Sequence, residues 1–340
     1  MLERFFTRLV RTAACALVSV VPALAQGQVS STETSRIHMV VWRGCEEACR
    51  GFIRYFEDRD LPVRVDVTDV ERDKERLSEV QARLISERPD LVVTWGTTVS
   101  RSILGTRAEH GRGSALGDIP ALFMIVADPV GSDLVESYDS SGRDHVSGVR
   151  NRVPEAVQLR LMFEYFRPDR LGVLNHPGEL NSTLNTEKLR DLSEEFGFTL
   201  IEHLYAPDAE GDVPTSQIPE AIAALKAKEA EAIYVGSSSY NLEHQAEFVA
   251  AAAAVDLPVF SAYTQMVQES GALMAIGTSY ANVGRLAAGQ AAEILLEGQA
   301  PQALPIKALN RYSVILNMTS AQQLDLYPPL SLIGVAEVVQ

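Results

Sequence analysis

Small hydroxyl and amide side chains occur in three loops where a strand is expected to give way to a helix. Gly96-Thr97-Thr98 and Gly236-Ser237-Ser238 share a glycine and hydroxyl pattern, and Asn175 to Ser182 is a longer polar loop. We expect Asn181 or Ser182 to be the N-cap of the helix that follows. Backbone N–H groups at a helix start favour an anion, which makes this loop a candidate carboxylate site. The alternative, that these side chains only cap helices, stays open for each loop taken alone.

The elements that would position these loops occur in two similar series. Strands and helices alternate from Ile37 to Val126. The same order starts again after His145 to Val149, where we place the first crossing between two lobes. This alternation predicts an α/β protein with two doubly wound parallel-sheet lobes.

The two series match element by element, and the match pairs their polar loops. Trp42-Arg43-Gly44 corresponds to Asn175-His176-Pro177, Gly96-Thr97-Thr98 to Gly236-Ser237-Ser238, and Ala127-Asp128 to Ala262-Tyr263. Ligands of open α/β sheets bind outside the carboxyl ends of the strands, so two facing lobes would line one cleft with hydrogen-bonding groups. The sequence therefore predicts a cleft suited to a small polar molecule.

The first 25 residues have the pattern of a signal peptide. Arg4, Arg8 and Arg11 precede an apolar run that ends at Ala23-Leu24-Ala25, a small-x-small cleavage site. The run is too short to span a bilayer as a helix, and no later stretch of about 20 apolar residues follows. We expect cleavage near Ala25 and a periplasmic or otherwise exported protein. A lipid anchor at Cys15 is less favoured, because most of the apolar run follows that residue.

Cys45 and Cys49 are the only cysteines beyond the signal peptide. Their spacing puts them about one turn apart on one face of a predicted helix, near the upper end of the Cα separation that a disulfide allows. An oxidising compartment favours a bridge. The alternative is a redox or metal pair, although the spacing is not C-x-x-C and no second ligand pair accompanies it.

Composition and motifs exclude several classes of function. The formal net charge of −15, with no local block of Lys and Arg, disfavours nucleic acid and anionic membranes as partners. The chain has no dinucleotide, phosphate-binding, nucleophile-elbow or H-E-x-x-H motif, and its six histidines show no metal-ligand spacing. Only His176 is expected at the cleft, as a solvated loop histidine, with pH-sensitive ligand contact as the alternative. We therefore expect no catalysis, no cofactor and no metal.

Several segments together carry a resemblance to a known family. They are Asn175-His-Pro-Gly-Glu-Leu-Asn-Ser182, Ala127-Asp-Pro-Val130, Val146-Ser-Gly-Val149, Gly271-Ala-Leu273, Gly277-Thr-Ser-Tyr280 with Gly284 and Ala287-Ala288, and Leu316-Asn317. These segments resemble the landmarks of ABC-transporter substrate-binding proteins of the tryptophan/tyrosine-like group, over nearly the whole mature chain. The resemblance implies the periplasmic-binding-protein type I fold, in which three crossings join two lobes around the ligand. It also implies that the Asn175 to Ser182 loop helps to hold the ligand's carboxylate.

This architecture gives an expected domain division. Residues 1-25 are the signal peptide, residues 36-147 plus 278-308 form the first lobe, and residues 148-277 plus 309-340 form the second. A three-stranded hinge is expected to join the lobes.

The expected function is that of an extracytoplasmic solute-binding protein. It would capture an amino acid or similar carboxylate between the lobes and deliver it, as a monomer, to an ABC permease in the membrane. The alternative is a soluble sensor component that presents its ligand to a membrane receptor or kinase. The candidate ligand-binding residues are Trp42, Arg43, Gly96, Thr97, Thr98, Asp128, Asn175, Asn181, Ser182, Gly236, Ser237, Ser238, Tyr263 and Tyr280.

Overall fold

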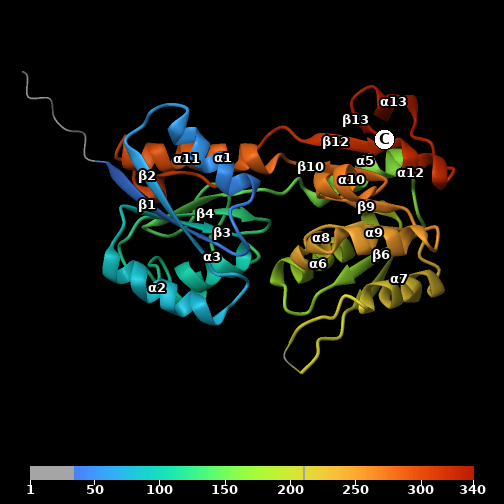
Figure 1. Cartoon of the computed structure of the whole chain (residues 1–340), viewed down its shortest axis with the longest axis horizontal. Coiled ribbons are helices and arrows are strands. Elements are labelled where there is room, and N and C mark those ends of the chain that lie inside the picture. The colour runs from blue at the N-terminus through green and yellow to red at the C-terminus, as the bar shows by residue number, and fades with distance from the viewer. Residues whose placement is uncertain (1–33, 210) are drawn as a thin grey trace, which may run out of the picture. The chain divides into compact units, whose positions relative to one another are not determined.

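The computed structural model describes residues 34–209 and 211–340, so the expected signal peptide and its cleavage site lie outside the described residues. The described chain forms two α/β lobes, each built on its own sheet (Figure 1). We call the lobe with the six-stranded sheet the first lobe and the lobe with the seven-stranded sheet the second lobe.

The first lobe has a wholly parallel sheet with the strand order β11-β5-β4-β3-β1-β2. Its strands are β1 (Ser35–Val41), β2 (Val63–Asp69), β3 (Leu91–Trp95), β4 (Ala121–Val126), β5 (Val146–Arg150) and β11 (Lys307–Ala308). Its helices are α1 (Glu47–Glu57), α2 (Glu75–Glu87), α3 (Thr97–Leu104), α4 (Arg107–His110), α11 (Tyr280–Leu295) and the short 3-10 helix η1 (Pro301–Ala303).

Helices cover both faces of this sheet, because its central strands are apolar on both sides. Every residue of β3 and β4 is buried. Alternate residues of β1 point to opposite faces, so that Met39 packs with α1 and α11 while Val40 packs with α2 and α3. Continuous apolar strands of this kind are typical of parallel sheets buried between helices.

The second lobe has a mixed sheet with the strand order β13-β12-β10-β9-β8-β6-β7. Its strands are β6 (Arg170–Asn175), β7 (Thr199–Leu204), β8 (Ala232–Val235), β9 (Val259–Ser261), β10 (Met274–Gly277), β12 (Ser313–Asn317) and β13 (Glu337–Val339), and only the β10–β12 pair is antiparallel. Its helices are α5 (Glu155–Tyr165), α6 (Leu180–Phe196), α7 (Gln217–Ala227), α8 (Ser239–Glu243), α9 (Gln245–Ala253), α10 (Thr264–Ser270), α12 (Met318–Gln323) and α13 (Leu330–Ile333).

The chain passes between the two sheets three times. It enters the second lobe after β5, returns to the first lobe between β10 and α11, and leaves it again between β11 and β12. The predicted two-lobed α/β architecture is therefore confirmed. The predicted boundary at residue 147 falls inside β5, so the exact lobe limits stay a prediction, and the sheet favours a first crossing after Arg150.

Helices α1 and α11 lie side by side although they come from distant parts of the chain (Figure 1). Gly51 of α1 and Gly284 of α11 allow this approach. A Cβ atom at Gly51 would collide with the backbone carbonyl of Ala281, and one at Gly284 with the carbonyl of Ala48. The first lobe thus includes a helix, α11, that follows strands β6 to β10 of the second lobe in the sequence.

Three local predictions are wrong in detail. The segment after His145 is strand β5 rather than a bare crossing. Helix α6 begins at Leu180 with Glu179 at the N-cap, so neither Asn181 nor Ser182 is the N-cap. The sequence from Leu242 to Ala254 predicts one helix, whereas the structure has two helices that meet at His244. The region after Tyr263 contains helix α10, for which there was no prediction from the sequence. No helix among the described residues is long and apolar enough to cross a membrane.

Candidate functional site

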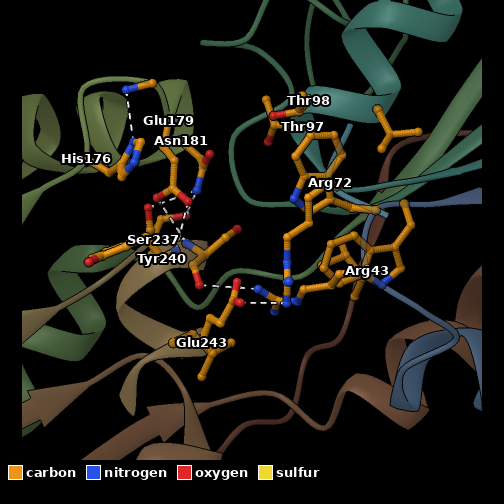
Figure 2. Close-up of a pocket in the computed structure, with 18 of the residues that line it drawn as sticks. Arg43, Arg72, Thr97, Thr98, His176, Glu179, Asn181, Ser237, Tyr240 and Glu243 are labelled. Atoms are coloured by element: carbon orange, nitrogen blue, oxygen red, sulfur yellow. Dashed lines mark hydrogen bonds and ion pairs between the residues drawn. The ribbon is translucent and has the colours of Figure 1, made fainter. Parts of the chain in front are cut away.

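A cavity of about 250 Å³ is lined by residues of both lobes (Figure 2). Many of them follow the carboxyl ends of parallel strands, where ligands of α/β sheets bind. Nine of the residues predicted from the sequence line it: Trp42, Arg43, Gly96, Thr97, Thr98, Asn181, Ser237, Tyr263 and Tyr280. The structure therefore brings loops from both repeats together around one space.

The first-lobe wall combines aromatic rings with a buried guanidinium. Arg43 follows β1, and its Cζ atom lies 5.6 Å from the centroid of the Trp95 ring. Its Nε donates to Glu46 Oε1 at 2.7 Å, and its side chain is only 9% exposed. Burial lowers the pKa of Arg43, but the Glu46 carboxylate outweighs it and the net shift is upward, so this cation is firmly charged.

Trp95 is the last residue of β3 and is 6% exposed. Its Nε1 atom is buried and has no hydrogen-bond partner in the described part of the chain. Gly96 follows with φ +82°, a conformation that favours glycine, and serves as the N-cap of α3 without any side-chain capping bond. This wall therefore contains hydrogen-bond donors that have no partner among the described residues.

Ile125 is an apolar residue of this wall and has an unusual backbone conformation. It has φ +57°, rare for a β-branched residue, and lies where the β4–β5 register shifts. The irregularity sits directly at the cavity, which Ile125 lines. Backbone strain of this kind clusters at binding sites.

Glu179 organises the second-lobe wall. Its carboxylate accepts hydrogen bonds from Ser238 Oγ at 2.8 Å, from the Ser239 N–H at 3.1 Å and from the Tyr240 N–H at 2.9 Å. It thereby caps the start of α8 (Figure 2). Burial raises the pKa of the Glu179 carboxyl to about 7, although these three bonds and the charge of Arg43 oppose the rise.

His176 lies against Tyr240 at the edge of the same wall. The two ring centroids are 5.3 Å apart, and His176 Nδ1 accepts the Gly178 N–H at 3.0 Å. Burial lowers the pKa of His176, and the nearby Lys74 lowers it further. A neutral imidazole with its proton on Nε2 is the form that fits these contacts at neutral pH.

Two polar contacts join the lobes across the cavity, and both end on α8. Arg72 Nη2 lies 2.6 Å from Glu243 Oε1, and Arg43 Nη1 donates to the Ser239 carbonyl at 3.2 Å. Glu71 and Arg72 both have positive φ values, 54° and 66°, in the turn after β2 that presents Arg72. Helix α8 thus receives both of these polar contacts from the first lobe.

Five predicted residues do not line the cavity but support those that do: Asp128, Asn175, Ser182, Gly236 and Ser238. Ser182 is buried, and its hydroxyl donates to Asn175 Oδ1 at 3.2 Å. Gly236 has no room for a Cβ atom, which would collide with Asn185 Oδ1. These residues hold the loops in place, and a direct ligand contact by any of them stays a prediction.

The sequence-based selection left out several cavity residues: Arg72, Lys74, Trp95, Asn151, Glu179, Tyr240 and Glu243. Trp95 was within reach, since it directly precedes the predicted loop Gly96-Thr97-Thr98. Arg72 follows the carboxyl end of β2, so the strand-end rule applied to β2 could also have found it. Asn151 lies just beyond β5, which was not predicted as a strand, and its Nδ2 donates to Tyr280 Oη at 3.1 Å.

The structure joins Cys45 and Cys49 in a disulfide at the start of α1. Within residues 34–209 and 211–340, no group of three or more His, Cys, Asp or Glu side chains could hold a metal ion. The polar groups of the cavity are instead hydrogen-bond donors and acceptors of both charges, an arrangement that binds a small polar molecule.

Comparison with known proteins gives the family. The model for ABC transporter substrate binding protein matches residues 38–339. The chain belongs to the ABC transporter substrate binding protein family. The predicted family is therefore confirmed, and it is a family of ligand-binding transporter proteins rather than enzymes. ABC substrate-binding proteins act outside the cytoplasm, in agreement with the coarse prediction of location.

Relatives of this ABC substrate-binding protein share its fold. A tyrosine-binding protein from Clostridioides difficile is 23% identical over 286 residues, which cover 83% of this chain and 77% of that protein. A conserved domain protein from Vibrio cholerae has a TM-score of 0.77 at 22% identity, covering 91% of this chain and 100% of the other. A domain from Streptococcus pneumonia in complex with L-Trp also has a TM-score of 0.77, at 21% identity, covering 90% and 100%. These similarities support the periplasmic-binding-protein type I fold.

Proposed function

We propose that this protein captures an amino acid with an aromatic side chain between its two lobes and delivers it to an ABC permease. The observation that carries the proposal is the composition of the cavity. Its wall includes the aromatic rings of Trp42, Trp95, Tyr240, Tyr263 and Tyr280. Aromatic walls with a few placed polar groups are typical of sites for small molecules that are apolar at one end and polar at the other.

The charges of the cavity support a zwitterion. The cationic side chains, Arg43, Arg72 and Lys74, come from the first lobe, whereas the acidic ones, Glu179, Asp212 and Glu243, come from the second. A free amino acid carries both a carboxylate and an ammonium group and can satisfy both walls. A sugar or other uncharged solute would leave this separation of charge unused.

The names of two relatives agree with this ligand class. One is a tyrosine-binding protein, and another structure holds L-Trp. At 23% and 21% identity these names suggest the class rather than the individual amino acid. The family match also favours delivery to a permease over the sensor alternative.

A thermal-shift screen of the free amino acids, simple sugars and aromatic carboxylic acids tests the proposal. A ligand that binds only the native protein raises the melting temperature, by an amount that grows with its concentration relative to Kd. We expect shifts with aromatic amino acids and none with sugars. A shift with sugars alone would contradict the proposal.

Tryptophan fluorescence gives an independent readout. The chain has two tryptophans, Trp42 and Trp95, and both line the cavity. An aromatic ligand that does not absorb where tryptophan is selectively excited, such as L-phenylalanine, should therefore change the tryptophan emission of the protein. Delivery is tested separately, by loss of uptake of the radiolabelled ligand in a strain that lacks the protein.

A further inference from the structure

We propose that the first lobe holds the ligand's carboxylate, at Trp95, Arg43 and the start of α3, and not the loop at the start of α6. This inference rests on the proposed function and places one group of the proposed ligand. It differs from the expectation drawn from the sequence, which assigned the carboxylate to Asn181 and Ser182.

The unpartnered indole of Trp95 is the first observation. Its Nε1 is buried, and no acceptor contacts it in the described part of the chain. A buried donor without a partner costs free energy, and such groups in native proteins call for an explanation. Trp95 lines the cavity, and we assign an acceptor atom of the ligand as the missing partner of its buried Nε1.

The start of α3 provides a second and independent set of donors beside Trp95. The helix has eight residues, its N-cap is Gly96, and no side chain caps it. Thr97 and Thr98, the first two helical residues, line the cavity. Their position at the positive end of an uncapped helix favours an anionic acceptor.

Arg43 brings a charged guanidinium, paired with Glu46 through Nε, to this region of the cavity. A guanidinium has five N–H donors, and the hydrogen bonds of Arg43 to Glu46 and Ser239 use two of them. The guanidinium also lies over the Trp95 ring, 5.6 Å from its centroid. A carboxylate next to Trp95 is therefore close to a guanidinium that has N–H donors left over.

Among the described residues, the second lobe brings one buried hydroxyl without a partner to the cavity wall, that of Tyr240, but no Lys or Arg side chain. The start of α8 is already capped by the Glu179 carboxyl group, which occupies the place that a ligand carboxylate would take there. The Asn181 amide donates to the Ser237 carbonyl at 2.9 Å, and the Ser182 hydroxyl donates to Asn175. A ligand carboxylate on this side would meet Glu179 and Glu243, whereas an ammonium would be attracted to them.

The crossing between the lobes offers a matching acceptor for that ammonium. Asn151 Oδ1 is buried without a partner among the described residues, while its Nδ2 is used by Tyr280. Asn151 lines the same cavity. Trp95 Nε1 is a donor and Asn151 Oδ1 an acceptor, so the two atoms match the carboxylate and the ammonium of a zwitterion in chemistry.

The test compares an amino acid with the amine that lacks its carboxylate. Kd values for L-tryptophan or L-tyrosine and for tryptamine or tyramine are measured by calorimetry on the wild-type chain, Trp95→Phe and Trp42→Phe. We expect Trp95→Phe to weaken amino-acid binding about tenfold to a hundredfold, the range for one hydrogen bond to a charged group, and to leave amine binding nearly unchanged. Trp42→Phe, the same substitution in the same cavity, should change both ligands by a similar factor.

The melting temperatures of the ligand-free variants show whether a loss of binding is caused by a loss of folding. Phe removes the unpartnered donor, so Trp95→Phe should melt no lower than the wild type. Equal weakening of amino acid and amine by Trp95→Phe overturns the inference. So does an amino-acid preference that survives Trp95→Phe and disappears in Ser182→Ala.

Failure of the proposed function gives a different result. If no amino acid binds but an aromatic carboxylic acid does, the amino-acid ligand is wrong, and the inference stands only if Trp95→Phe weakens that acid. If the amines bind but neither the amino acids nor the carboxylic acids do, the carboxylate site is wrong. The cavity would then still be a binding site, but for a different class of ligand.

Discussion

Glu179 is an acid held where its charge is disfavoured by burial and favoured by hydrogen bonds. It occupies the N-cap of α6 in sequence and the start of α8 in space, so one side chain joins two helices of the second lobe. Asn and Ser are the residues that helix-cap preferences favour, which is why the sequence pointed to Asn181 and Ser182 instead. The pKa of about 7 gives this arrangement a measurable signature.

We predict that Glu179 makes the ligand-free protein less stable as pH rises from about 4.5 to about 7. The folded-state pKa is raised from 4.5 to about 7, so between these values the native state binds more protons than the unfolded chain. The contribution of Glu179 to the free energy of unfolding is therefore complete below pH 4.5 and is lost above pH 7. Between these values it falls by up to about 3 kcal/mol. Glu179→Gln cannot titrate and should lack this part of the pH dependence.

The measurement is the difference in unfolding free energy between wild type and variant across pH 4.5 to 8. Glu187→Gln, an exposed carboxyl on the same helix, serves as the control. A difference that stays constant across the window would show that Glu179 does not titrate there.

At the scale of elements, the contact between α1 and α11 depends on two glycines. We predict that Gly284→Ala destabilises the protein by several kcal/mol, because the new methyl group collides with the Ala48 backbone carbonyl and backbone cannot move aside cheaply. Gly289→Ala is a matched control in the same helix, where the nearest atom, Tyr55 Oη, is 3.9 Å from the added Cβ. Since Ala is the better helix former, this control should be neutral or stabilising by up to about 1 kcal/mol.

Denaturant unfolding of the two variants checks the prediction. Similar midpoints for both would mean that α1 and α11 can separate without cost.

The disulfide at the start of α1 closes a loop between residues only four apart. For so short a loop, the loss of chain entropy in the unfolded state stabilises the native state by about 2 kcal/mol. We predict that Cys45→Ala/Cys49→Ala lowers the unfolding free energy by about this amount or less and leaves ligand affinity intact, since neither cysteine lines the cavity. A thiol reagent should label the unfolded, unreduced wild-type chain only after reduction. Labelling without reduction would contradict the bridge.

Most elements could be predicted because buried parallel strands read as short apolar runs. Strands β3 and β4 are of this kind, and the match between the two series located the loops that follow them. Strand β5 was missed because Ser147 and Gly148 interrupt its apolar pattern, and Gly148 is required there since Phe123 fills the space of a Cβ atom. Helix α10 was missed because only Met266 and Val267 of its seven residues are buried.

The site was predictable only in part, because its polar contacts join residues that local patterns do not relate. Arg72 and Glu243 lie in different lobes, and the local sequence around either residue does not predict that they pair. The strand-end loops follow a general rule of α/β sheets, so many cavity residues could be named. The unpartnered state of Trp95 Nε1 depends on what surrounds it in space and could not be read from the sequence.

At the scale of the whole molecule, the contacts between Arg72 and Glu243 and between Arg43 and Ser239 link lobe closure to α8. We predict that saturating ligand shifts the protein towards closed forms and reduces its radius of gyration in solution scattering. An unchanged scattering profile at saturation would count against a hinge.

Glu243→Gln, which removes the ion pair with Arg72, should lower ligand affinity only modestly. Arg72 is 52% exposed, and partly exposed ion pairs contribute about 1 kcal/mol or less, which corresponds to about a fivefold loss of affinity at most. The effect should shrink at high salt. Glu202→Gln removes an ion pair with Arg190 inside the second lobe and is the control. A loss far above fivefold would assign Glu243 a direct role with the ligand.

The place of α11 in the first lobe also constrains the order in which the chain can fold. The apolar face formed by β1, β3 and β4 is covered by α1 and by α11, and α11 begins only at Tyr280, after nearly all of the second lobe has been synthesised. A fragment that ends at Arg150 would therefore expose residues such as Leu122 and Met124 and should aggregate. Adding a separate peptide that spans α11 should restore the solubility of this fragment. The first lobe can therefore complete its fold only after most of the second lobe has been synthesised.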